Sequence, residues 1–140
     1  MFIGEYRHTL DAKGRLSFPV KLREKLGAEF VMCRSYERCV MIYPMEAWKE
    51  FAAKFESLPV VENRQIPRYF FSSGEYASLD SQGRVVIPQR FRNYAGIDKN
   101  VVIIGNNKHL ELWDEAAWDE ELESGMESDS IMSRMIKLGF

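Results

Sequence analysis

The sequence contains only two cysteines and two histidines in 140 residues. Cys33 and Cys39 lack the C-x-x-C spacing, and with two distant histidines they make a poor metal site. We interpret both cysteines as small buried or half-buried side chains, and we do not expect a disulfide between them. We expect neither a metal nor any other cofactor.

The sequence also lacks long apolar runs. No stretch approaches the roughly 20 apolar residues that span a bilayer. At the N-terminus, Glu5, Arg7 and His8 interrupt any basic-then-apolar signal pattern. We therefore expect a cytoplasmic protein without a membrane partner.

Basic residues are missing from one segment. Residues 110–129 hold nine Asp and Glu and no Lys or Arg. Because the net charge of the whole chain is −2, the rest of it is net positive. The basic side chains gather near the N-terminus, at Arg7, Lys13, Arg15, Lys21, Arg23 and Lys25. Such a cluster suits phosphate binding, although many charge clusters are only solvated faces.

An internal repeat is the most informative feature that is present. One sequence offset relates Asp11 to Asp80, Gly14 to Gly83, Arg15 to Arg84 and Pro19 to Pro88. In each copy we predict two strands around the Asp–Gly turn, then a short helix, two strands and a helix. The ranges after the turn are 19–27, 30–33, 39–43 and 44–55 in the first copy and 88–96, 101–104, 110–113 and 114–122 in the second.

A unit this short cannot bury enough apolar surface to fold alone. We therefore predict that the two copies complete one core, as a mainly β fold with helices (α+β). They would form a pseudo-symmetric β-barrel with the trailing helices outside. The repeats span residues 5–47 and 76–119, and residues 120–140 are acidic and then apolar. Residues 56–73 read as a packed connector that could include a strand, and residues 130–140 either dock on a neighbouring chain or fray.

The turn residues have different roles in this interpretation. Asp11, Gly14, Asp80 and Gly83 shape tight hairpins, because Asp accepts backbone N–H bonds and Gly adopts positive φ. A hairpin does not require the arginine that follows each glycine. Arg15 could pair with Asp11 across the turn, or the planar guanidinium groups of Arg15 and Arg84 could contact phosphate or guanine.

The two copies differ beside this arginine. The first has Lys13 in the turn and Arg7 and His8 on the incoming strand, whereas the second has Ser81 and Gln82 in the turn. We therefore expect the first copy to carry most of the contact with nucleic acid.

Other residues give weaker signals. The aromatic residues at helix or strand spacing read as core or subunit contacts, namely Trp48, Phe51, Phe55, Trp113 and Trp118. Paired carboxylates with a base, a metal cluster and a phosphate-cradling glycine loop are all missing, so we do not expect an enzyme or a small-molecule substrate.

The N-terminal segment and the two Asp-x-x-Gly-Arg motifs closely resemble the MraZ family of bacterial transcriptional regulators, which have two AbrB-type domains. The resemblance covers nearly the whole chain. It rests on Gly4-Glu5-Tyr6-Arg7-His8-Thr9-Leu10-Asp11, on Lys13-Gly14-Arg15 and on the second motif from Asp80 to Arg84.

This resemblance implies a swapped-hairpin (double-split) β-barrel and a ring-shaped homo-oligomer. It also implies a nucleoid-associated protein that binds double-stranded DNA at direct repeats upstream of the division and cell-wall gene cluster. By position, Lys13, Gly14 and Arg15 would contact DNA, with Arg84 as the second motif's arginine and Arg7 beside them. The alternative is an antitoxin-like module that holds a protein partner on the acidic segment 110–129.

Overall fold

The computed structural model describes residues 1–140, and its elements repeat in the order that the sequence predicts. The first copy contains β1 (Glu5–Thr9), β2 (Arg15–Ser17), α1 (Val20–Leu26), β3 (Phe30–Arg34), β4 (Val40–Pro44) and α2 (Met45–Glu56). The second contains β5 (Glu75–Ala77), β6 (Arg84–Val86), α5 (Gln89–Ala95), β7 (Asn100–Asn106), β8 (His109–Asp114) and α6 (Glu115–Glu120). The predicted succession of elements is confirmed in both copies.

Strand exchange joins the two copies. The large antiparallel sheet has the order β1-β7-β8-β4-β3-β5, so each copy's first strand pairs with the third strand of the other copy. The central contact joins β4 to β8, and β2 pairs with β6 in a separate two-stranded ribbon. Neither copy therefore forms its sheet without the other.

One apolar core lies inside this arrangement and draws on both copies. Leu16, Phe18 and Phe30 of the first copy are buried with Ile87 and Phe91 of the second, in one cluster of 18 residues. The prediction that the copies complete a shared core is confirmed. The aromatic prediction also holds, because the three tryptophans are buried in two smaller clusters outside this core.

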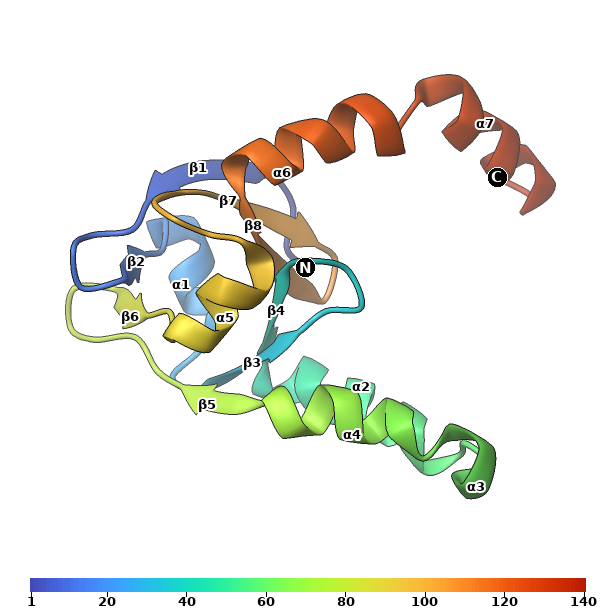
Figure 1. Ribbon diagram of the computed structural model, residues 1–140, viewed down its shortest axis with the longest axis horizontal. Coiled ribbons are helices and arrows are strands. Elements are labelled where there is room, and N and C mark those ends of the chain that lie inside the picture. Colours follow the sequence, from blue (N-terminus) through green and yellow to red (C-terminus); the bar gives the residue numbers. More distant parts are fainter.

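The connector between the copies is helical, so the suggestion of a strand there was wrong. It forms α3 (Val60–Asn63) and α4 (Gln65–Ser73), which together with α2 project from the sheet as a helical arm (Figure 1). Pro67 is compatible with α4 because it lies in the first turn, where no intrahelical N–H bond is lost. Phe51, Phe55 and Phe70 pack ring against ring within the arm, so the predicted packing of the connector is confirmed.

The C-terminal residues are also helical. The chain continues from α6 through a π-helical turn (Glu121–Gly125) into α7 (Ser128–Lys137), which extends away from the sheet (Figure 1). No residue of α7 is buried, and Ile136 and Phe140 are largely exposed. Docking of this end on a neighbouring chain remains a prediction.

Hydrogen bonding gives two separate sheets and not one closed ladder, so the fold is α+β with a large antiparallel sheet. Both cysteines are buried thiols, as predicted. None of the helices is long and apolar enough to cross a membrane.

Candidate nucleic-acid interface

The two Asp–Gly turns have the same hydrogen bonds. One carboxylate oxygen of Asp11 accepts the backbone N–H groups of Lys13 and Arg15, each at 2.9 Å. The backbone N–H of Gly14 donates to the Asp11 carbonyl at 3.0 Å, and Gly14 has a φ of 75°. Asp80 makes the equivalent bonds in the second copy, at 2.9 to 3.0 Å. Both turns are therefore closed by the same set of hydrogen bonds.

The arginine after each glycine is oriented by the same aspartate. Arg15 donates from Nε to Asp11 Oδ2 at 2.6 Å, and Arg84 donates from Nε to Asp80 Oδ2 at 2.9 Å. Neither arginine uses its two terminal Nη atoms in a hydrogen bond or an ion pair. Exposed ion pairs add little stability, so the main effect of these pairs is to hold the guanidinium groups in place.

Electrostatics keeps the turn aspartates ionised. The backbone N–H of Arg15 lowers the pKa of Asp11 most. Desolvation opposes this, and the Arg15 guanidinium and the backbone N–H of Lys13 lower the pKa further. Arg84 lowers the pKa of Asp80 in the same way. Each carboxylate therefore stays charged near neutral pH and keeps its arginine oriented.

Pairing of β2 with β6 places both arginines on one face of the ribbon. Arg15 lies opposite Val86 and Ser17 lies opposite Arg84, while Leu16 turns its side chain into the core. The two arginines are thus diagonal neighbours, roughly 7–8 Å apart at their backbones. Figure 1 shows both turns at the end of the molecule that lies away from the helical arm and α7.

Two further arginines flank the ribbon, and the sequence analysis did not assign them to the site. Arg23 of α1 donates from Nε to the Phe18 carbonyl at 2.8 Å, and Arg92 of α5 donates from Nε to the Ile87 carbonyl at 3.0 Å. Their Nη atoms have no partner, and neither residue forms an ion pair. The available signal was that Arg23 and Arg92 share the offset of the turn residues.

Each flanking arginine lies against the turn of the other copy. A Cβ atom added to Gly14 would lie 3.0 Å from Arg92 Cζ. One added to Gly83 would lie 2.8 Å from Arg23 Nη1 and closer still to its Cζ and Nε. The glycines therefore leave room for these side chains, and four arginines lie on or beside the ribbon with only two carboxylate partners.

The copies differ at the turn tip. Lys13 is exposed and its Nζ has no partner, whereas Ser81 and Gln82 supply no charge in the second turn. The structure thus brings Lys13, Gly14, Arg15 and Arg84 together on the ribbon and its turns.

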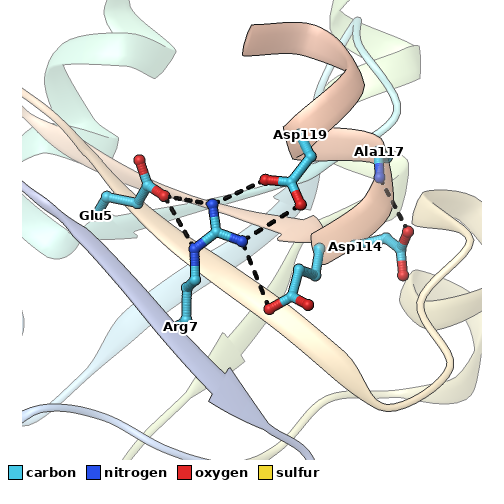
Figure 2. A network of polar contacts seen from close by, with 6 residues as sticks. Glu5, Arg7, Asp114, Ala117 and Asp119 are labelled. Atoms are coloured by element: carbon cyan, nitrogen blue, oxygen red, sulfur yellow. Dashed lines mark hydrogen bonds and ion pairs between the residues drawn. The ribbon is translucent and has the colours of Figure 1, made fainter. Parts of the chain in front are cut away.

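Arg7 is held elsewhere. Its guanidinium pairs with Glu5 at 2.7 Å, with Asp119 at 2.8 Å and with Glu115 at 3.6 Å (Figure 2). Asp119 and then Glu5 raise the pKa of Arg7 above its already high value. Arg7 therefore joins β1 to α6, and its charge is already balanced within the chain.

Comparison with known proteins places the chain in context. Residues 1–66 and 70–138 match the sequence model of a family described as "MraZ protein, putative antitoxin-like". The chain is 42% identical to a protein of Clostridium beijerinckii and to one of Halothermothrix orenii, and 40% identical to one of Acetivibrio thermocellus. Each alignment covers 99% of both chains, and each relative is named "Transcriptional regulator MraZ".

Proposed function

The chain belongs to the MraZ family, and from that membership we propose that it is a transcriptional regulator that binds double-stranded DNA through the β2–β6 ribbon. Its targets are direct repeats upstream of the division and cell-wall gene cluster, and it acts at the nucleoid in the cytoplasm. The full-length likeness to proteins named as transcriptional regulators supports this class of function over an enzyme.

One observation carries the proposal. Four arginines on or beside the ribbon (Arg15, Arg23, Arg84 and Arg92) each bond within the protein through Nε and leave both Nη atoms free. A planar guanidinium fixed at Nε presents its outer N–H groups to phosphate or to the O6 and N7 atoms of guanine. The major groove is wide enough to admit a two-stranded ribbon.

The first copy makes the stronger contact in this proposal. Lys13 adds a free positive charge beside Arg15, and Gly14, with a φ of 75°, joins the two in the first turn. Arg84 contacts DNA from the second copy without a neighbouring lysine. Arg7 is left out of the interface because three carboxylates already surround its guanidinium.

Assembly increases the affinity of so small a surface. We propose that copies of the chain form a ring whose ribbons contact successive repeats, since linked sites bind far more tightly than one site alone. Within each chain of the ring, the strands exchanged between the repeats and the β2–β6 ribbon suit a double-split barrel. Its AbrB-type repeats lie at residues 5–47 and 76–119.

A protein-binding, antitoxin-like role is the alternative. The description of the family supports it, and its partner surface would be the acidic segment 110–129. Two carboxylates of this segment, Glu115 and Asp119, already pair with Arg7 of the same chain. The full-length relatives are named as transcriptional regulators, so DNA binding is the better supported function.

The test measures the affinity for DNA by gel shift at several salt concentrations. The DNA carries the direct repeats upstream of the division and cell-wall gene cluster. Arg15→Ala should abolish specific binding, and Arg84→Ala should weaken it less. For each arginine that contacts only phosphate, the slope of log affinity against log salt should fall by about 0.9. Arg134→Ala is the matched control, because Arg134 lies on exposed α7 far from the ribbon. Binding by Arg15→Ala equal to wild type would refute the assignment.

A further inference from the structure

A polar pocket lies away from the duplicated turns, where the end of β3, the end of α4 and the helix α5 meet. Its volume is about 430 Å³. Arg34, Ser72, Arg90 and Asn93 are among the residues that line it, and no Asp or Glu does. The pocket is therefore positively charged and within the usual size range of small-molecule sites.

Arg34 is fixed on one wall without a carboxylate partner. It donates from Nε to the Tyr69 carbonyl at 3.0 Å, and its Cζ lies 4.0 Å from the centre of the Tyr69 ring. Its backbone N–H also bonds Ser73 Oγ at 3.0 Å. Both Nη atoms have no partner. A half-buried guanidinium that is held this firmly and lacks an internal anion is suited to bind one from outside.

Arg90 supplies the second charge from α5. Its Nη1 donates to the Ser73 carbonyl at 3.2 Å, and its Nη2 pairs with Glu75 at 3.0 Å. Its Cζ lies 4.3 Å from the centre of the Phe91 ring. The pair with Glu75 is exposed, so it is weak. It holds Arg90 in place and takes little away from the attraction of its guanidinium for a second anion.

Neutral donors and a rigid wall complete the pocket. Ser72 Oγ has no partner, and Asn93 accepts from Gln89 through Oδ1, which leaves its Nδ2 donor unused. The hydroxyl groups of Tyr69 and Tyr94 both donate to the Ser35 carbonyl, at 2.8 and 2.6 Å, and so tie α4 and α5 to the β3–β4 loop. Burial, and then the contact with Tyr69, raise the pKa of Tyr94 to about 12.

The other half of the molecule has no copy of this pocket. By the register of β3 and β7, Gly105 takes the place of Arg34, and at the offset of the turn residues Lys25 takes the place of Tyr94. Lys25 instead donates to the Met1 carbonyl at 3.0 Å. The pocket is therefore not part of the duplicated DNA-contacting machinery.

We propose that this pocket binds a small phosphorylated molecule, with the phosphate held between the guanidinium groups of Arg34 and Arg90. Phosphate oxygens accept the N–H groups of arginine in a bidentate manner, and the remaining volume accommodates the body of a small molecule. A phosphate of the DNA backbone has the same chemistry, so the experiment separates the two sources.

The experiment titrates the full-length protein with inorganic pyrophosphate by calorimetry, at constant ionic strength and without DNA. Wild type should bind with a Kd of about 1 mM or below. Arg34→Gln and Arg90→Gln should each weaken binding about tenfold or more, since each removes charge-assisted hydrogen bonds. The experiment uses two variants because Arg34 also packs on Tyr69. If Arg34→Gln folds poorly, Arg90→Gln still tests the site.

The controls are Arg134→Gln on α7 and Arg15→Ala on the ribbon, and both should bind pyrophosphate as wild type does. Arg34→Gln should in turn retain DNA binding. Absence of pyrophosphate binding, or binding by both pocket variants that equals that of wild type, would overturn the proposal. So would loss of pyrophosphate binding in Arg15→Ala, which would place the anion on the ribbon. Weaker DNA binding by Arg34→Gln with unchanged pyrophosphate binding would assign the pocket to the DNA backbone instead.

Discussion

Replacing Gly83 by alanine tests the packing between the second turn and the arginine of the first copy. Gly83 has a φ of 77°, and an added Cβ would lie 2.8 Å from Arg23 Nη1 and closer to Cζ and Nε. The Arg23 side chain must move to make room. When it moves, it loses the 2.8 Å hydrogen bond from Nε to the Phe18 carbonyl.

Two contributions set the magnitude of the effect. A residue with a Cβ in the left-handed region costs about 1–2 kcal/mol. Loss of the Arg23 hydrogen bond adds about 1 kcal/mol. Gly83→Ala should therefore lower the free energy of unfolding by about 2–3 kcal/mol. Gly14→Ala is the matched control, because its Cβ would lie 3.0 Å from Arg92 Cζ, which a small shift relieves, and it should cost about 1–2 kcal/mol.

Urea unfolding monitored by tryptophan fluorescence measures both variants. Gly83→Ala should also show a shallower salt dependence of DNA binding than Gly14→Ala, because it displaces a flanking arginine. If the two variants lose the same stability, Arg23 does not pack on the second turn as described. If Gly83→Ala is the more stable of the two, the steric reasoning is refuted.

Three further predictions concern other contacts. The turn carboxylates have lowered pKa values when folded, so their stabilisation is complete above about pH 4 and is lost as the pH falls further. In urea unfolding at pH 7, the double variant of Asp11→Asn and Asp80→Asn should be less stable than wild type. The difference in the free energy of unfolding should narrow below about pH 4, and a difference that stays constant would contradict this. Trp118 Nε1 is buried without a partner, whereas Trp113 Nε1 donates to a glutamate at 2.9 Å. In urea unfolding, Trp118→Phe should therefore destabilise the protein less than Trp113→Phe, by about 1–3 kcal/mol. Equal losses of stability would argue against this reasoning. Arg7→Gln should speed hydrogen exchange in α6 and leave the affinity for DNA unchanged. A large loss of affinity would show that Arg7 belongs to the DNA interface.

The turns were predictable because their determinants are local. An aspartate that accepts two backbone N–H groups, followed by a glycine at positive φ, is encoded within five residues. The offset between copies then revealed the duplicated order of elements. The sequence was also sufficient to predict one shared core, since neither unit could bury enough surface alone.

The rest depends on contacts between distant residues. The run Tyr69 to Phe71 is apolar without a clear period, so it did not distinguish a strand from a helix. What settles the helix is tertiary: the Tyr69 hydroxyl bonds Ser35, and its carbonyl accepts from Arg34. The places of Arg23 and Arg92 follow from the pairing of β2 with β6, which a repeat offset does not specify.

The strand exchange has a consequence for synthesis. β1 comes first off the ribosome, but its only strand partner is β7, which ends at Asn106. At translation rates of about 5–20 residues per second, β1 waits on the order of 5–20 s for that partner. The charged residues Glu5 and Arg7 on β1 disfavour pairing with other nascent chains during this interval. The N-terminal strand is thus among the last to be secured, and the order of synthesis is not the order of assembly.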